Sequence, residues 1–356
     1  MSAVGVIVNP WAGKDVRRLH APAGHSPDSA KIGIVRRVAI AAVEAGAGRV
    51  LVAADSGGIG RRAIAGVAHA ELVEGPDTGS ALDTRRAATQ LAEQHCTPIV
   101  VLGGDGTCRD VAIGAPRATV LAISTGTNNV FPRVIDGSSA GTAAGLLASG
   151  RVPVAGTVRQ AKRLVVTIER AGVTVETDIA LVDVAAIATT QTGSRAVLRA
   201  GAIVAVVAAI AHPTSTGLSA IAGRLHPLER DEPGAVHVRL CEPALGGRRL
   251  RAPIVPGQFE VVGVQHLEVL PDGGTVSFEG PLVLAYDGER ERQLPAGSVA
   301  HVRVERTGPY MVDVDHVLLY AAHHQLFDEP VDQPFVEPCD AAAAAIAGSG
   351  EAPHGH

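Results

Sequence analysis

A glycine-rich loop with a single carboxylate follows one of the most apolar stretches of the chain. Val100-Val101-Leu102 runs directly into Gly103-Gly104-Asp105-Gly106-Thr107, and residues 108–113 can continue as a helix. Glycines permit left-handed backbone conformations and let a bulky anion approach the chain closely. Successive backbone amides and the first turn of a helix both favour phosphate. The loop therefore predicts a phosphate-binding site that contains one carboxylate, Asp105.

A second polar loop follows the next apolar run. Ser124-Thr125-Gly126-Thr127-Asn128-Asn129 offers hydroxyl and amide groups around one glycine, which suits hydrogen bonding to phosphate or ribose without added charge. Taken alone, it could equally be an ordinary turn capped by Thr and Asn. The chain contains only three Asn residues, and the third, Asn9, closes the first apolar run just before Gly13 and Lys14.

The elements around these loops must bring them together. Apolar strand-like runs alternate with helical stretches, expected at 32–45 and 81–95, which predicts a doubly wound α/β layer with a mostly parallel sheet. Ligands bind such sheets at the carboxyl ends of the strands, where all three loops would emerge. The expected strands are Ala3–Val8, Arg49–Ala54, Glu71–Glu74, Ile99–Leu102 and Thr119–Ile123. The candidate nucleotide-binding residues are Asn9, Gly13, Lys14, Gly103, Gly104, Gly106, Thr107, Thr125, Gly126, Thr127, Asn128 and Asn129.

After a further helix expected at 138–149, the pattern changes to short β-rich runs separated by Gly, Pro and charged turns. This pattern predicts a β-rich, antiparallel second domain, interrupted by one helix at Ser194–Ala211. From Pro330 onward the chain lacks periodicity, and residues 330–356 are expected to form a flexible tail. The expected strands of the second domain are Leu164–Glu169, Val173–Asp178, Ile179–Ile187, Val236–Cys241, Phe259–Val264, Thr275–Phe278 and Leu282–Tyr286.

Composition excludes several classes of partner. The 356 residues carry a net charge of -5 with no cluster of Lys or Arg, which argues against nucleic acid. Aromatic residues are only 3% of the chain, so base stacking and an aromatic-rimmed lipid surface have few candidates. The longest apolar run, Ala200–Ala211, is about half of a membrane span, and the four scattered cysteines suit a reducing compartment. We expect a cytoplasmic protein without a membrane span.

The three loops together resemble a known superfamily. Asn9-Pro10-x-x-Gly13, Gly103–Thr107 and Gly126-Thr127-Asn128 are similar to the signature that joins NAD kinases with diacylglycerol and sphingosine kinases. The longer strings around Asn9 and Ile123–Pro132, with Gly217–Gly223, resemble the acetoin-catabolism protein X branch, described as ATP-NAD kinase-like. The likeness covers about residues 1–325. It implies an ATP-binding α/β domain at 1–123, completed by about 305–325, and an acceptor domain at 124–304.

The resemblance also implies ATP with Mg²⁺ as the phosphoryl donor, and two candidate catalytic carboxylates. In NAD kinases the loop aspartate, here Asp105, takes the acceptor proton; in diacylglycerol kinases the role falls to a turn that resembles Tyr286-Asp287-Gly288-Glu289. Asp105 is the preferred base and Asp287 the second candidate. By itself the Asp287 turn could be a plain hairpin. The metal ligands are unknown from the sequence.

The resulting hypothesis is an ATP-dependent kinase that phosphorylates a hydroxyl of a small acceptor, with NAD as the leading candidate. Two departures from the families weaken the finer assignment: no Asn follows residue 129 to grip a dinucleotide, and Asp110 stands where lipid kinases have Glu. A kinase of a small polyol or a lipid, and a nucleotide-binding regulator that transfers nothing, stay open as alternatives. The expected partners are a nucleotide and a small acceptor, and any homo-oligomer is expected to be a dimer.

Overall fold

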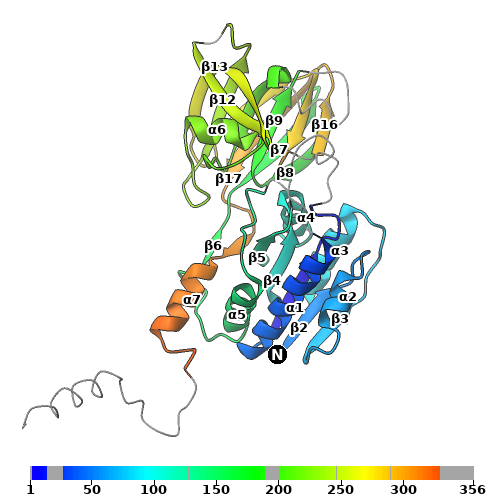
Figure 1. Ribbon diagram of the computed structural model, residues 1–356. Helices are drawn as coiled ribbons and strands as arrows, with labels where there is room; N and C mark the ends of the chain where they lie inside the picture. The colour runs from blue at the N-terminus through cyan, green and yellow to red at the C-terminus, as the bar shows by residue number, and fades with distance from the viewer. Residues whose placement is uncertain are drawn as a thin grey trace, which may run out of the picture. The chain divides into compact units, whose positions relative to one another are not determined.

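The computed structural model describes residues 2–13, 27–126, 129–188, 200–245, 247–288 and 290–328 (Figure 1). The chain divides into two compact units, Met1–Tyr320 and Ala321–His356, and the sheets described below all belong to the first. Three of the predicted site residues, Lys14, Thr127 and Asn128, lie outside the described residues, as does the expected tail at 330–356.

The first sheet has seven strands in the order β3-β2-β1-β4-β5-β18-β6. Neighbouring strands from β3 to β18 run parallel, and only β6 is antiparallel to its neighbour. Consecutive apolar residues of β1 point to opposite faces and are buried on both, as expected for a parallel sheet covered by helices. Its strands are β1 (Ala3–Val8), β2 (Arg49–Ala53), β3 (Ala70–Val73), β4 (Cys96–Gly103), β5 (Thr119–Ser124), β6 (Val158–Gln160) and β18 (Tyr310–Val312).

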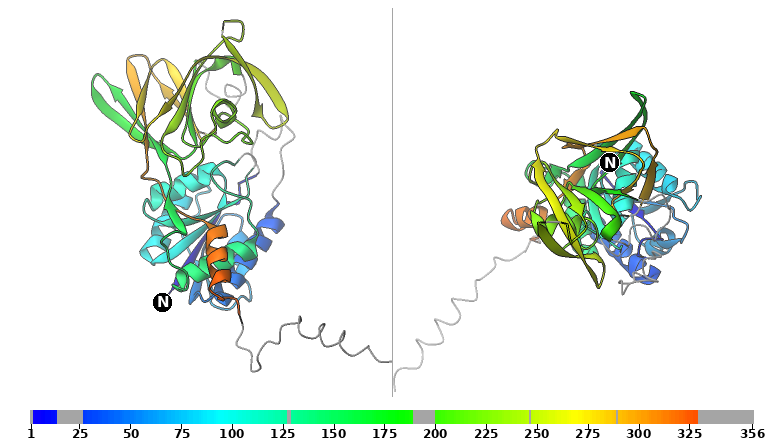
Figure 2. Two further views of the ribbon diagram at one scale, coloured as in Figure 1. Left: turned by 90° about the vertical axis from the view of Figure 1, so that its left-hand side faces the viewer. Right: turned by 90° about the horizontal axis from the view of Figure 1, so that it is seen from above.

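Helices cover both faces of this sheet (Figure 2). On one face α3 and α4 bury Leu91 and Val111 against Ile7 and Val101 of the strands. On the other face α1 packs closely against α5. The helices of the first part are α1 (Asp28–Glu44), α2 (Ile59–Ile64), α3 (Ala81–Glu93), α4 (Asp105–Gly114) and α5 (Gly137–Ala148).

The second part consists of two largely antiparallel sheets that share one core. A seven-stranded sheet has the order β12-β13-β11-β10-β9-β15-β16, and a four-stranded sheet has the order β14-β17-β7-β8. Val166 and Val302 of the smaller sheet pack with Val207 and Leu284 of the larger one. The strands are β7 (Arg163–Arg170), β8 (Val173–Ala180), β9 (Asp183–Ile187), β10 (Ile203–Ala208), β11 (Ala235–Cys241), β12 (Arg248–Val255), β13 (Gln258–Leu270), β14 (Thr275–Glu279), β15 (Leu282–Tyr286), β16 (Arg290–Leu294) and β17 (Ser298–Glu305). Two short helices, α6 (Ser219–Leu225) and α7 (Val314–His323), and one turn of 3-10 helix, Ala200–Ala202, complete the elements described.

The expected fold class, a doubly wound α/β part followed by a β-rich part, is confirmed. The helix expected over Ser194–Ala211 is wrong, because residues 203–208 form the strand β10 between β9 and β11. Ile203, Val206 and Val207 are β-branched and buried from both sides of the sheet, which favours a strand over a helix. Residues 194–199 of that prediction lie outside the described residues.

The strand expected over Ile179–Ile187 is also different in the structure. It is divided into β8 and β9 by Leu181 and Val182, which are fully buried although they belong to neither strand. Their backbone amides bind the side chain of Asp287, as described below. The break therefore gives Asp287 two hydrogen-bond donors that a continuous strand pairing would use elsewhere.

No helix in the part of the chain that the structure describes is both long enough and apolar enough to cross a bilayer.

Candidate functional site

The site begins where the strand order of the first sheet reverses. β2 and β3 extend from β1 in one direction and β4 and β5 in the other, so the loops after β1 and β4 separate above the sheet and leave a crevice. Asn9 spans this point, because its backbone N–H donates to Leu102 O at 2.9 Å and its side-chain Nδ2 donates to Thr107 Oγ1 at 2.8 Å. The loop after β1 and the glycine loop after β4 are thus in direct contact.

A buried lysine fixes the loop after β1. Lys31 has no exposed surface, and its Nζ donates to the backbone carbonyls of Asn9, Pro10 and Ala12 at 3.2, 2.8 and 2.7 Å. Because these carbonyls turn toward the ammonium, Gly13 can leave the loop with a left-handed φ of 72°. The sequence analysis missed Lys31. A lysine in the apolar stripe of α1, in line with Val35, is the signal that could have found it.

The glycine loop is packed too closely to carry side chains. β4 ends at Gly103, Gly104 is the N-cap, and α4 begins at Asp105. A Cβ on Gly103 would lie under 3.0 Å from the Thr107 side chain, and one on Gly104 would lie 2.9 Å from Asn129 Oδ1. The backbone of this loop therefore packs closely against the first turn of α4 and against the loop after β5.

Asp105 is the residue that joins the glycine loop to the loop after β5. Its carboxylate accepts the backbone N–H of Phe131 at 2.8 Å and that of Val130 at 3.1 and 3.2 Å, and the residue is only 5% exposed. Arg230 holds the same segment from the other side, since its Nη2 donates to the carbonyls of Val130 and Phe131. The carboxylate of Asp105 thus fixes the position of the loop after β5.

The loop after β5 closes the cluster. Thr125 N–H donates to Gly103 O at 3.1 Å, and Asn129 Nδ2 donates to Ser124 Oγ at 2.7 Å. A Cβ on Gly126 would also lie within 3.0 Å of the Asn129 side chain. Thr125 is buried, and its hydroxyl has no hydrogen-bond partner among the described residues. A ligand oxygen is one group that would satisfy it.

A pocket of about 310 Å³ opens beside these loops. Its walls come from the ends of β1 and β2, the start of α3 and the first two turns of α4, and they are rich in hydroxyl, amide and carboxylate groups. The polar lining residues include Asn9, Ser56, Ser80, Thr107, Arg109 and Asp110. The volume is that of a small-molecule site, and the amides at the start of α4, near Gly106 and Thr107, favour an anion.

Asp287 lies at the tip of the β15–β16 hairpin, with a left-handed φ of 51°. Its Oδ1 accepts the backbone N–H groups of Leu181 and Val182 at 2.9 and 2.8 Å, and its Oδ2 lies 3.7 Å from Arg109 Nη1. The side chain has no exposed surface, and this burial raises the pKa of Asp287 to about 6, although Arg109 and the amides oppose the rise. Asp287 thus faces α4, the helix that begins with Asp105.

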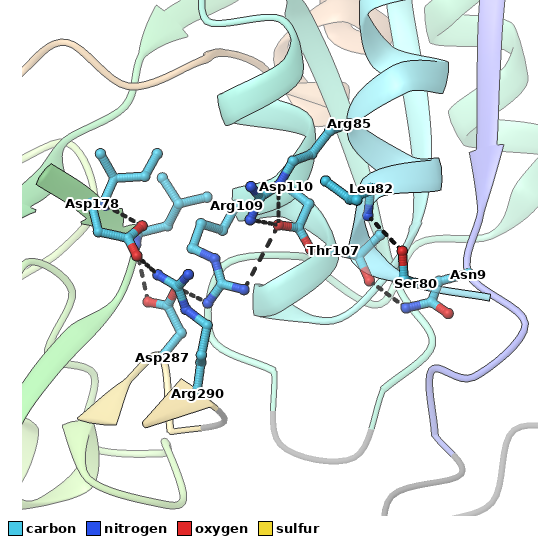
Figure 3. Close-up of polar contacts among 12 residues, drawn as sticks. Asn9, Ser80, Leu82, Arg85, Thr107, Arg109, Asp110, Asp178, Asp287 and Arg290 are labelled. Atoms are coloured by element: carbon cyan, nitrogen blue, oxygen red, sulfur yellow. Dashed lines mark hydrogen bonds and ion pairs between the residues drawn. The ribbon is translucent and has the colours of Figure 1, made fainter. Parts of the chain in front are cut away.

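Arg109 and its neighbours form a charged cluster between α4 and the β15–β16 hairpin (Figure 3). Arg85 of α3 contacts Asp110 at 3.0 Å, and Arg290 pairs with Asp178. Figure 3 also shows the Asn9–Thr107 contact on the other side of α4. The cluster was not foreseen from the sequence, because its partners are far apart along the chain.

The two candidate catalytic carboxylates lie near one another. The thiol of Cys108 is fully buried, and this burial raises its pKa, with further increases from the charges of Asp105 and Asp287 and an opposing effect from Arg230. The structure therefore brings Asn9, the glycine loop, Thr125, Asn129 and both carboxylates into one region.

The described residues contain no group of three or more His, Cys, Asp or Glu side chains that could hold a metal ion. Mg²⁺ in phosphoryl-transfer sites is commonly held by one or two carboxylates together with substrate phosphates. Four carboxylate side chains line the pocket, those of Asp55, Asp77, Asp83 and Asp110. Carboxylate oxygens are hard ligands, so this lining fits a Mg²⁺ ion whose other ligands come from a bound phosphate.

Comparisons with known proteins agree with this architecture. Residues 4–152 match the family model of the ATP-NAD kinase N-terminal domain, and residues 162–307 match that of the acetoin catabolism protein X C-terminal domain. The acetoin catabolism protein X of Cupriavidus necator is 34% identical over 339 residues, covering 91% of this chain and 93% of the relative. The crystal structure of yeast NADH kinase complexed with NADH matches with a TM-score of 0.50 at 15% identity, covering 94% of this chain and 91% of that one.

Proposed function

The chain belongs to the acetoin catabolism protein X family, and from this premise we propose that it is an ATP-dependent kinase that phosphorylates a hydroxyl of a small acceptor. The observation that carries the proposal is the meeting of three polar loops at the point where the strand order reverses, beside a 310 Å³ pocket. Phosphoryl transfer needs this kind of site, because catalysis depends on positioning and on stabilising the charge of the phosphoryl group.

The donor phosphates would lie against the amides of the loop that begins α4. The start of the helix adds its partial positive charge, and Asn9, Thr107 and the hydroxyl of Thr125 offer hydrogen bonds. Lys14, Gly126, Thr127, Asn128 and Asn129 complete the proposed nucleotide-binding set. A bound Mg²⁺ would supply charge neutralisation at the phosphates, with Asp110 as the protein ligand.

Asp105 is our first candidate for the group that orients the acceptor hydroxyl and takes its proton, and Asp287 is the second. NAD is the leading acceptor, supported by the match of residues 4–152 to the ATP-NAD kinase model. It is also supported by the likeness of the fold to an NADH kinase complexed with NADH. A place in the cytoplasm and a role in NADP formation or acetoin catabolism are parts of the same proposal.

The direct test is a turnover assay with ATP and Mg²⁺ against NAD, NADH and a panel of polyols. The kinase proposal expects ADP and a phosphorylated acceptor to appear in equal amounts. If no acceptor in the panel is phosphorylated, the proposal fails.

Asp105→Asn tests the role of the carboxylate. We expect turnover to fall by roughly 10² to 10⁴, the usual contribution of a general base, while ATP affinity changes little. The matched control is Glu93→Gln, an exposed carboxylate near the end of α3, which should leave turnover at the wild-type value. Unchanged turnover in Asp105→Asn would remove Asp105 as the base.

One observation favours a second candidate function, a nucleotide-binding regulator. The carboxylates of Asp105 and Asp287 both accept backbone N–H groups, an arrangement that orders loops without any chemistry. A regulator would bind ATP or NAD(H) and form no product. Calorimetry run beside the turnover assay separates the two functions.

A further inference from the structure

Arg109 is a buried arginine whose hydrogen-bonding capacity is not used. Its side chain is 6% exposed, and neither Nε nor Nη1 has a hydrogen-bond partner among the described residues. The nearest carboxylate oxygens, Asp287 Oδ2 and Asp110 Oδ1, lie 3.7 and 3.8 Å from the guanidinium nitrogens, beyond hydrogen-bond distance. A buried guanidinium in this condition is unusual, because burying a polar group without hydrogen bonds is costly.

The neighbouring arginines differ from Arg109 in this respect. Arg85 Nε donates to Asp110 Oδ1 at 3.0 Å, Arg292 Nε donates to Glu176 Oε1 at 2.7 Å, and Arg290 donates to Asp178. Each of these carboxylates therefore has another arginine as its close partner. Arg109 is attracted by Asp110 and Asp287 but bonded to neither, so it can form hydrogen bonds to an incoming oxyanion without first breaking one.

The position of Arg109 points to the oxyanion. Arg109 lies one helical turn after Asp105 on α4 and is among the residues that line the 310 Å³ pocket, together with Asn9, Gly106 and Thr107. The amides at the start of α4 suit the inner phosphates of a nucleotide. A group one turn further along the helix, toward Asp287, is placed to contact the terminal phosphate of the nucleotide.

We propose that Arg109 forms an oxyanion subsite that binds the terminal phosphate of a nucleoside triphosphate, and that Asp287 is a positioning residue for Arg109. The planar fork of a guanidinium matches two phosphate oxygens and suits this task. Asp287 Oδ1 is fixed by two backbone amides, which leaves Oδ2 directed at Arg109. The inference rests on the proposed nucleotide site, and it assigns Asp287 a role other than proton transfer.

The experiment compares the binding of AMP, ADP and ATP by calorimetry, with the full-length chain and Mg²⁺ present. Wild-type protein should bind ATP more tightly than ADP. In Arg109→Gln the affinity for ATP should fall by roughly 10- to 100-fold, the range expected for a charge-assisted hydrogen bond, while the affinity for AMP stays within about twofold. Arg86→Gln, an exposed arginine on α3 next to Arg85, is the matched control and should bind all three nucleotides as wild type does.

Because Arg109→Gln leaves two carboxylates near an uncharged side chain, it could fail to fold. Arg109→Lys keeps the charge and removes only the fork, and it should weaken ATP alone, by roughly 3- to 10-fold. The proposal is overturned if wild-type protein binds ATP no better than ADP. It is equally overturned if both variants keep wild-type ATP affinity, or if they lose AMP and ATP to the same degree.

A double-mutant cycle tests the role of Asp287. If Asp287 acts through Arg109, Asp287→Asn should weaken ATP binding in the wild-type background and have no further effect in Arg109→Lys or Arg109→Gln. Additive losses would contradict a positioning role. The wild-type protein could phosphorylate no acceptor while the Arg109 variants lose affinity for ATP but not for AMP. That result would support this subsite and refute the kinase. If the protein phosphorylates an acceptor but the Arg109 variants keep wild-type ATP affinity, the kinase is supported and this subsite is refuted.

Discussion

At the scale of single residues, the two candidate carboxylates are held in different ways. Asp105 accepts amides from the loop after β5, so it belongs to the sheet edge that carries the other motifs. Asp287 is held by the break between β8 and β9 and faces an arginine. A residue in the first environment can turn toward a substrate hydroxyl when the loop moves. Asp287, in the second environment, cannot turn its Oδ2 toward a substrate without losing the contact with Arg109.

Asp287 should make stability depend on pH. Burial raises its folded-state pKa to about 6, above the value of about 3.9 in an unfolded chain, so its contribution is fully present below pH 4 and is lost as the pH rises through 6. A shift of this size corresponds to about 3 kcal/mol. We expect the difference in unfolding free energy between wild type and Asp287→Asn to change by this order between pH 4 and pH 7, in favour of wild type at low pH.

Urea unfolding at several pH values measures this difference directly, and the other titrating groups cancel in the comparison. The control is Asp77→Asn, an exposed carboxylate that should leave the pH dependence unchanged. Parallel curves for wild type and Asp287→Asn would contradict the prediction.

Residues with local signals could be predicted, and residues with distant partners could not. Gly103, Gly104 and Asn9 were found because a buried strand followed by a polar loop is visible in a few consecutive residues. Arg109 and Lys31 were missed because their roles depend on contacts with residues that are distant in the sequence. Asp287 is 178 positions after Arg109. The carbonyls that Lys31 binds precede it by 19 to 22 positions.

At the scale of elements, the contact between α1 and α5 depends on a stripe of glycines. Gly137, Gly141 and Gly145 are spaced four apart, so they lie on one face of α5, and a Cβ on any of them would lie under 3.0 Å from a backbone carbonyl oxygen of α1. The two helix backbones therefore touch. Because α1 carries Lys31, this contact helps to set where the loop after β1 lies.

Gly141→Ala should destabilise the fold even though alanine is the better helix former. The substitution gains up to about 1 kcal/mol in helix propensity but forces a methyl group against Val38 O, an overpacking that typically costs about 1–3 kcal/mol. We expect a net loss of roughly 1–2 kcal/mol in the free energy of unfolding. Chemical denaturation monitored by circular dichroism measures it.

Gly33→Ala is the matched control for this prediction. Gly33 is also inside a helix, but the nearest atom to its Cβ position is Arg37 Nη1 at 3.4 Å, the mobile end of an exposed side chain. This variant should be as stable as wild type or more stable. If the two substitutions change the free energy of unfolding equally, helix propensity alone determines their effect and the close contact at Gly141 contributes nothing.

The misassigned segment shows where prediction of elements fails. Val204, Val206 and Val207 lie in a continuous apolar run, and such a run is compatible with a buried helix or a buried strand. Its pairing with Ala185 and Val238 decides the matter, and neither partner is near in sequence. The alternating strands and helices of the first part were predictable because short apolar runs, which end at Gly, Pro or polar residues, alternate with longer stretches that have a helical period.

At the scale of the whole molecule, the first sheet needs residues from the far end of the chain. β18 pairs with β5 through Tyr310 and Met311, and Val314 and Val317 behind it are buried. A chain that ends at Glu305 would therefore expose the edge of β5 and lose these apolar contacts. We expect it to lose about 3 kcal/mol or more of stability, from two buried side chains at about 1.5–3 kcal/mol each.

Thermal unfolding of the chain ended at 305, compared with the chain ended at 328, tests this expectation. The longer version keeps β18 and α7 and is the appropriate control. If both versions unfold at the same temperature, β18 contributes nothing to the sheet.

The two stretches of chain that connect the first sheet with the β-rich sheets lie side by side. β6 pairs antiparallel with β18, and beyond them Ala161 N–H donates to Pro309 O at 2.9 Å and Gly308 N–H to Ala161 O at 3.0 Å. A single linker would let the two parts turn about its axis. A hydrogen-bonded pair of strands resists twisting and yields most easily to bending across its plane, so relative motion would follow one direction. Any bending of this pair would therefore move the Asp287 hairpin along one path relative to Arg109, which keeps the guanidinium opposite the same carboxylate.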